Sequence, residues 1–330
     1  MQLVPVSLTY FLEVARTGSI SEAAQTLNVA PSAISRQIAK LESGIGVPLF
    51  VRHPRGMTVT DEGSRLLAHA RRSEAESASL VDELRTGRGA DVRSVTVACS
   101  EGFARRVVPR AMAAFRREHP DVTFRLDIVD RQEATRRVAE GIADVAATYT
   151  MGPQHDVRVE RAVVIPVAAI VPPGHELAGR ERITLAELCA YPLALGTAGT
   201  SQRELFDIGV QLEGLTVRPA LVCDALTPQY EFVRSGGGIA LVGDLGDLDE
   251  GAEGDGGPSP EGVTYVRVDH PVFRQREAQI QTMPGRRLPW AASQFTELLV
   301  SLLPGRPRQH PAAPAMPRSG QGPSPRSDGT

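Results

Sequence analysis

Cysteine is scarce in this chain, which has only Cys99, Cys189 and Cys223 among its 330 residues. The three are odd in number and far apart, so they form neither a disulfide framework nor the close pairs that bind zinc or exchange disulfides. Unpaired cysteine is among the residue types most often buried. We therefore expect three small core residues in a reducing compartment.

Histidine clusters and catalytic motifs are missing as well. The seven histidines are scattered without metal-site spacing, and there is neither a Gly-x-Ser-x-Gly elbow nor a Gly-Lys-Ser/Thr phosphate loop. The triple glycine at 236–238 follows an expected helix and precedes an expected strand, which indicates a helix cap and not a nucleotide loop. We expect no enzymatic activity, no metal and no cofactor.

Long apolar runs are also absent. No stretch approaches the ~20 residues that a membrane-spanning helix needs. The first residues lack the basic segment that opens a signal peptide. Hydrophobic residues make up 42% of the chain, an ordinary value for a soluble protein of two domains. We expect a cytoplasmic protein with no membrane partner.

Charge is nearly balanced over the whole chain, with a net value of −3, but not locally. Between residues 31 and 72, seven lysines and arginines stand against three acidic residues. Such a cluster is by itself as typical of a solvated surface as of a nucleic-acid partner. The pattern around it has to decide between the two.

The densest pattern lies at residues 30–42. Ile34, Ile38 and Leu41 recur at steps of four and three, so they share one face of a helix. The opposite face is small, polar and cationic, which suits the major groove of DNA. The residues of this helix that we expect to contact DNA are Ser32, Ala33, Ser35, Arg36, Gln37 and Lys40.

The flanking sequence predicts two earlier helices. Gly18 stands where a glycine ends a first helix, and Ser19 with Glu22 forms a capping box that starts a second. Residues 28–30 leave room only for a turn before Pro31, which is well placed at the first position of the third helix. Helices joined by so tight a turn form a helix-turn-helix.

Two short strands, at 49–51 and 57–59, bracket a basic loop at 52–56. This arrangement predicts a wing. We expect Arg52, His53 and Arg55 to lie against phosphates or in the minor groove.

In order and spacing, residues 11–63 resemble the winged helix-turn-helix of LysR-type transcriptional regulators. The shared residues are Phe11, Ala15, Gly18, Ser19, Ala23, Ala24, Leu27, Ser35, Arg36, Gln37, Ile38, Leu41, Glu42, Gly46, Val47, Pro48, Leu49, Phe50, Arg52, Thr60 and Gly63. The family often has a polar residue where Ala30 stands and glutamine where Pro31 stands. This departure removes a capping side chain and one base-contacting amide, so it bears on which operator is bound.

Residues 61–85 contain no proline, and Thr60 is placed to cap a helix there. Small and apolar residues recur at the four-three spacing of a coiled coil. They are Leu66, Ala70, Ser73, Ser77, Leu80 and Leu84. The resemblance implies a linker helix that pairs antiparallel with its copy in a partner. The alternative is a surface helix packed on its own domain. A hinge is expected at 86–90.

After residue 93, strands alternate with helices, which predicts an α/β domain with a largely parallel sheet. Expected strands lie at 95–98, 122–129 and 141–148, and expected helices at 103–119, 131–140 and 290–303. An apolar stretch at 163–171 would cross into a second lobe, and 263–268 would lead back. The resemblance implies the two-lobed fold of type 2 periplasmic binding proteins.

The expected organisation is therefore a winged helix-turn-helix domain at 1–60, a linker helix with its hinge at 61–90, and an effector domain at 91–303. Lobe I would comprise about 91–165 and 269–303, and lobe II about 166–268. Residues 244–260 are acidic and rich in glycine, so we expect a mobile loop. Residues 304–330 are rich in proline and poor in apolar residues, so we expect a disordered tail.

Ligands of α/β lobes bind where strands end, and helix N-termini there attract anions. The segment at 100–103 and the segment at 196–201, which is rich in hydroxyls and glycine, occupy such places, and so does the end of the strand at 148. Residues 224–227 are a fourth, weaker candidate. Each hydroxyl could equally act as a helix cap without a ligand role. Glu101 would repel an anion and Arg105 and Arg106 would offset it, so a small organic acid is weakly favoured. The expected effector contacts are Ser100, Phe103, Thr148, Thr197, Thr200, Ser201 and Thr227.

These features predict a ligand-responsive transcriptional regulator of the LysR type. It would bind dyad-symmetric promoter DNA as a homodimer or homotetramer, with RNA polymerase as a further partner if it activates transcription. The alternative is a DNA-binding regulator whose effector domain has lost its ligand and serves only oligomerisation. A transport-linked solute-binding protein would need a signal peptide and no helix-turn-helix, and the sequence meets neither condition.

Overall fold

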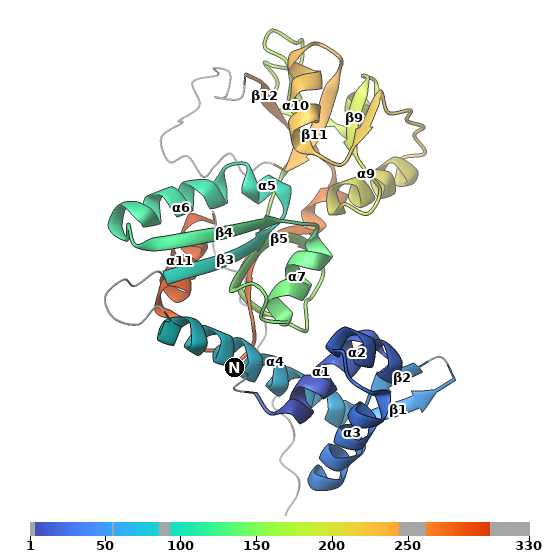
Figure 1. Ribbon diagram of the computed structural model, residues 1–330. Helices are drawn as coiled ribbons and strands as arrows, with labels where there is room; N and C mark the ends of the chain where they lie inside the picture. Colours follow the sequence, from blue (N-terminus) through green and yellow to red (C-terminus); the bar gives the residue numbers. More distant parts are fainter. Residues whose placement is uncertain (1–3, 55, 86–92, 244–261, 304–330) are drawn as a thin grey trace, which may run out of the picture.

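The computed structural model describes residues 4–54, 56–85, 93–243 and 262–303. A small head, a long connecting helix and a two-lobed α/β body follow one another along the chain (Figure 1). The expected hinge at 86–90, the loop at 244–260 and the tail from 304 lie outside the described residues.

The head has the three helices and the wing that the sequence predicts. Gly18 ends the first helix in the left-handed conformation with a φ of 68°, and the Ser19 hydroxyl accepts a hydrogen bond from the N–H of Glu22 to start the second. The buried rings of Phe11 and Phe50 lie 5.1 Å apart and join the first helix to the wing. The elements are α1 (Val6–Thr17), α2 (Ile20–Leu27), α3 (Pro31–Ile45) and the antiparallel strands β1 (Phe50–His53) and β2 (Gly56–Val59).

A single helix, α4 (Asp61–Arg85), connects the head to the body (Figure 1). The Thr60 hydroxyl accepts a hydrogen bond from the N–H of Gly63 at 2.9 Å, which confirms Thr60 as a cap. Ala70 is buried in the core of the head, and the next residue, Arg71, forms a 3.1 Å ion pair with Glu140 of the body. The helix therefore packs against both parts.

Lobe I contains a five-stranded sheet in the order β4-β3-β5-β13-β6. Two helices around Phe115 and Phe295 cover one face, and a third helix covers the other. The strands are β3 (Arg93–Cys99), β4 (Val122–Ile128), β5 (Val145–Met151), β6 (Arg158–Val164) and β13 (Arg276–Thr282). The covering helices are α6 (Val107–Glu118) and α11 (Trp290–Leu302) on the first face and α7 (Arg131–Ala139) on the second.

Lobe II contains a six-stranded sheet in the order β10-β9-β11-β7-β12-β8. Leu205 and Phe206 pack on one face, and Tyr230 and Val233 on the other. The strands are β7 (Val167–Val171), β8 (Arg182–Thr184), β9 (Leu193–Gly196), β10 (Leu221–Cys223), β11 (Ile239–Gly243) and β12 (Thr264–Asp269). The helices are α8 (Leu185–Cys189), α9 (Ser201–Leu212) and α10 (Leu226–Arg234).

The chain crosses between the lobes twice, from β6 to β7 and from β12 through the short helix η2 (Pro271–Gln275) to β13. Both entering strands pair antiparallel with their neighbours, β7 with β11 and β12, and β13 with β5 and β6. The two-lobed α/β fold is thus confirmed, but the sheets are mixed and not largely parallel. Parallel pairing needs a crossover within the lobe, and a strand that enters from the other lobe has none.

The single helix predicted at 103–119 is wrong. The structure has α5 (Glu101–Ala104) and then α6, with Arg106 between them at φ −140° and ψ −60°. Pro109 explains the break, because it has no N–H and would remove a hydrogen bond from the interior of a continuous helix. In the first turn of α6 that N–H has no intrahelical partner in any case.

Candidate functional site

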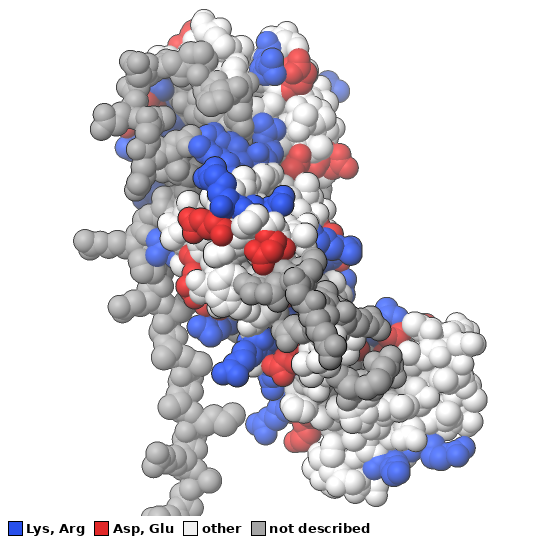
Figure 2. All heavy atoms as spheres, turned by 60° about the vertical axis from the view of Figure 1, so that its left-hand side comes forward, with Lys and Arg blue, Asp and Glu red and all other residues white. Residues whose placement is uncertain are grey.

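The outer face of α3 presents the residues predicted to contact DNA. Ile34 and Ile38 are buried against the head, as their spacing predicts. Ala30 at the start of α3 makes no capping hydrogen bond. On the outer face, Ser32, Arg36 and Lys40 are exposed, and Ala33, Ser35 and Gln37 are half-buried. Figure 2 shows cationic side chains along the lower edge of the head.

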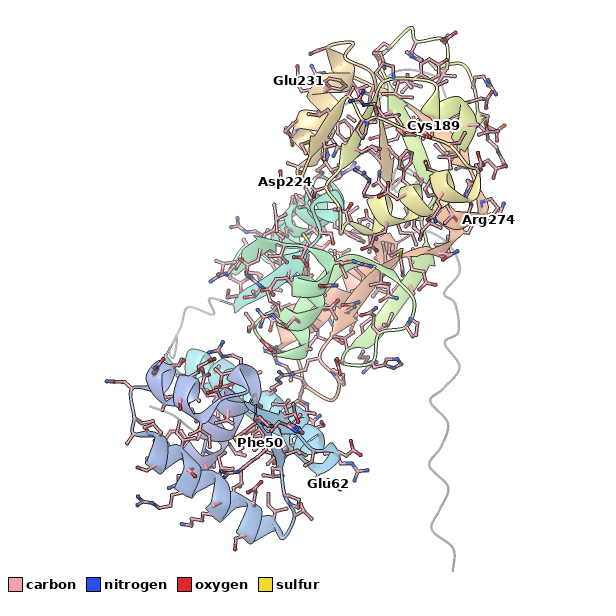
Figure 3. All side chains as sticks on the ribbon, turned by 90° about the vertical axis from the view of Figure 1, so that its right-hand side faces the viewer. Phe50, Glu62, Cys189, Asp224, Glu231 and Arg274 are labelled. Carbon is pink, nitrogen blue, oxygen red and sulfur yellow. The ribbon has the colours of Figure 1, made fainter. Side chains whose placement is uncertain are left out.

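The wing is fixed to α3 by an acidic side chain. Glu42 Oε1 accepts hydrogen bonds from the N–H of Leu49 at 2.8 Å and of Phe50 at 3.3 Å. Phe50 points into the interior of the head (Figure 3). Arg52 and His53 are exposed on β1, and His53 Nε2 lies 3.0 Å from the Thr58 hydroxyl. Arg55 lies outside the described residues.

The base of the wing lies directly on the turn between α1 and α2. The N–H of Met57 donates to the Gly18 carbonyl at 2.7 Å. A Cβ added to Gly56 would lie 2.5 Å from that same oxygen, so a side chain there would push the wing away. The position of the wing against α3 is therefore determined from two sides.

A cavity of about 1100 Å³ separates the two lobes. Lobe I contributes its walls from the segment around α5, the start of α7, and Tyr149 and Arg276. Lobe II contributes the start of α9, the segment before α10, and Tyr230. Asp224 lines the cavity and lies where lobe II faces α5 (Figure 3).

Four of the seven residues predicted to contact an effector line this cavity. They are Ser100, Thr197, Thr200 and Ser201. Thr200 also caps α9, since its hydroxyl accepts a hydrogen bond from the N–H of Arg203.

The other three predicted contacts do not line the cavity. Phe103 faces the core of lobe I, where its ring lies 4.8 Å from that of Tyr149. Thr227 is exposed on α10. Thr148 is fully buried, with its hydroxyl 2.7 Å from that of Ser100, so it touches a lining residue and not the cavity itself.

Glu101, Arg131 and Arg105 of lobe I reach across the cleft to lobe II. Both carboxylate oxygens of Glu101 accept from the N–H of Leu226 at 2.8 Å, so the charge expected to repel an anion instead caps α10. Arg131 and Glu204 form a 2.9 Å ion pair. The guanidinium of Arg105 lies 3.6 Å from the centre of the Tyr230 ring.

Arg276 is a residue that the sequence did not single out. It begins β13 at the second crossing and is only 5% exposed. Its Nε donates to the Ser201 hydroxyl at 3.2 Å, and its guanidinium lies 3.6 Å from the centre of the Tyr149 ring. Burial lowers the pKa of the Arg276 guanidinium, and it also raises the pKa of Tyr149.

Within the described residues, no cluster of three or more histidine, cysteine or acidic side chains is arranged to hold a metal ion. None of the helices described has both the length and the apolar surface needed to cross a bilayer.

A winged helix-turn-helix joined to a two-lobed domain with a cavity defines a class of ligand-binding transcription regulators. Residues 6–64 match the bacterial regulatory helix-turn-helix protein model of the lysR family, and residues 88–304 match the LysR substrate binding domain. The second match alone covers more than half of the chain. The protein belongs to the LysR family and is a DNA-binding transcriptional regulator with an effector-binding domain.

Known proteins share this organisation over most of their length. The chain is 27% identical to the HTH-type transcriptional regulator YybE of Bacillus subtilis over 89% of this chain and 97% of the relative. It is 28% identical to the RuBisCO operon transcriptional regulator of Allochromatium vinosum over 71% and 78%. A full-length OxyR of Pseudomonas aeruginosa has the same fold, with a TM-score of 0.54, 16% identity, and coverage of 90% of this chain and 93% of that one.

Proposed function

We propose that this regulator changes transcription when a small molecule, by preference a small organic acid, occupies the cavity between its lobes. The observation that carries the proposal is the cavity of about 1100 Å³, in a chain that also presents an exposed recognition helix. A cavity of this size is large enough for a metabolite. Because the walls come from both lobes, a ligand would bias their relative position and, through α4, the position of the head.

The proposed DNA contacts are those expected from the sequence. Ser32, Ala33, Ser35, Arg36, Gln37 and Lys40 of α3 would enter the major groove, and Arg52, His53 and Arg55 of the wing would lie against the backbone or the minor groove. The exposure of Arg36, Lys40 and Arg52 supports this assignment.

We further propose a homodimer or a homotetramer on a dyad-symmetric promoter site. Leu80 and Leu84 support it, because they are 46% and 70% exposed on α4 and would be covered by a second copy. Binding to chromosomal DNA implies a cytoplasmic protein, and an activator would also contact RNA polymerase.

The test combines genome-wide binding of the full-length chain with ligand screening. The sites found should be dyad-symmetric, and at least one compound in a mixed panel of neutral, cationic and anionic metabolites should raise the Tm and alter the DNA footprint. Specific DNA sites with no compound active would favour the alternative, an effector domain that serves only oligomerisation. No specific site at all would contradict the proposal.

A further inference from the structure

Arg276 lies on the wall of the cleft where the lobes join. Its Nε donates to Ser201 in lobe II, and its guanidinium stacks on Tyr149 in lobe I. Gly243, at the end of β11, leaves space for it, because a Cβ there would lie 2.3 Å from Arg276 Nη1. The fold therefore leaves space for the guanidinium of Arg276, which contacts both lobes.

The described residues provide no counter-ion for this charge. Within the described residues no carboxylate forms an ion pair with Arg276, and its Nη1 is buried without a hydrogen-bond partner. A buried cation that lacks a paired anion destabilises the folded protein. Arginine also keeps its proton under ordinary conditions, so it does not escape this cost by becoming neutral.

The helix N-termini around the cleft differ in whether a carboxylate caps them. α7 begins with Asp130, whose carboxylate accepts two backbone N–H groups at 2.9 Å. The N-terminus of α10 is capped by the carboxylate of Glu101, which accepts a hydrogen bond from the N–H of Leu226. α9 begins at Ser201 with only the Thr200 hydroxyl as its cap, and Glu204 in its first turn is paired with Arg131. Among the described residues no carboxylate caps the positive end of α9, which adjoins Arg276.

We infer that Arg276 binds an anionic group of the effector, a carboxylate, sulfate or phosphate, between its guanidinium and the N-terminus of α9. The inference rests on the proposed function, since it names the chemical class of ligand for the same cavity. Arg276 is among the residues that line that cavity, so it borders the space that an anion in the cleft would occupy. Its contacts with Ser201 and Tyr149 make the bound anion a link between the two lobes.

The test is thermal unfolding of the full-length chain, titrated with acetate, sulfate and phosphate at constant ionic strength and with a panel of mono- and dicarboxylates. At least one anion should raise the Tm of the wild type. Arg276→Gln should weaken its binding by about 10- to 100-fold, the effect of losing a hydrogen-bonded charge. Without anion, Arg276→Gln should unfold at the same temperature as the wild type or higher, because it removes a buried, unpaired charge.

Two further variants separate this role from a general effect of charge. Arg125→Gln removes the same charge from an exposed position on β4, away from the cavity, and should keep the anion response of the wild type. Arg276→Lys keeps the charge without the planar fork and should recover part of the response.

Equal anion responses in the wild type and Arg276→Gln would overturn the assignment, and so would a panel in which no anion acts. If a neutral or cationic compound raises the Tm where anions do not, the effector cleft stands and Arg276 loses its role. Should Arg276→Gln fail to fold, Gly243→Ala replaces it, since the new methyl group displaces the guanidinium. Unchanged anion binding in Gly243→Ala would then overturn the assignment.

Discussion

Arg36 and Arg276 have the same side chain in opposite surroundings. Arg36 is exposed on α3, where water solvates its charge until DNA arrives. Arg276 is almost completely buried and lacks an ion-pair partner among the described residues. An exposed cation without a bound anion costs the folded protein little stability. A buried cation destabilises the protein until an anion pairs with it. The folding stability of the head is therefore expected to change little when DNA binds. The stability of the body is expected to depend on an anion in the cleft.

The two regions also differ in how the chain builds them. The groups proposed to contact DNA come from one continuous stretch, α3 and the wing. The cleft collects its groups from segments far apart in the sequence, near residues 100, 131, 200, 226 and 276. Damage to one region should consequently leave the other working.

Phe11→Ala should have the largest effect and tests this independence. Phe11 is fully buried between α1 and the wing, so its truncation should cost the head about 3–5 kcal/mol of stability and abolish specific DNA binding. Calorimetry of the full-length variant should still show the anion-dependent rise in the Tm of the body. Phe295→Ala, in the core of lobe I, is the matched control and should damage the body instead. An anion response lost in Phe11→Ala would show that the regions are not independent.

Arg36→Ala should weaken binding to the preferred operator by about 1–3 kcal/mol if the guanidinium contacts a guanine. Unrelated DNA should lose much less. Fluorescence anisotropy on both DNA sequences measures the difference. Equal losses on the two would place Arg36 on the backbone and not on a base.

Arg52→Ala is the counterpart on the wing. It should weaken binding to all sequences alike and reduce the salt dependence by about one phosphate contact. Anisotropy at several salt concentrations gives the slope. An unaltered slope would remove Arg52 from the DNA interface.

Glu101→Gln tests the contact by which lobe I holds α10 of lobe II. It replaces the carboxylate that caps α10 from the opposite lobe, which should cost about 1 kcal/mol and allow the lobes to separate. Thermal unfolding and small-angle scattering report the two effects. Glu231→Gln, which removes an exposed charge from the same helix, should change neither.

The ion pair between Arg131 and Glu204 should contribute least. Its side chains are 22% and 34% exposed, and pairs of this kind contribute about 0.2–1 kcal/mol. A double-mutant cycle on the Tm measures the coupling. A coupling well above that range would make this pair, and not Glu101, the main contact that closes the cleft.

The head could be predicted from the sequence because each step is local. The spacing of Ile34 and Ile38, the glycine that ends α1 and the serine that starts α2 all act within a few residues of one another. The rule that ligands bind where strands end also located Ser100 and the Thr197–Ser201 segment, which line the cavity.

The rest of the cleft depends on which way side chains point and on where the chain crosses between the lobes. A sequence pattern contains neither. Phe103 and Thr227 lie in segments next to the cavity, but helix pitch turns Phe103 into the core and Thr227 outward. Arg276 lies in a polar, charged segment typical of a surface loop. It is buried because the chain crosses between the lobes there, and β13 itself was not predicted.

An anion bound at Arg276 should control how the DNA-binding head contacts its operator. Footprinting the wild type and Arg276→Gln on the same operator, across a titration of the anion that raises the wild-type Tm, tests it most directly. The footprint of the wild type should change over the concentrations that raise its Tm, and the footprint of Arg276→Gln should stay at its anion-free state throughout. A footprint that changes at the same concentrations in both proteins would contradict control of the head through Arg276.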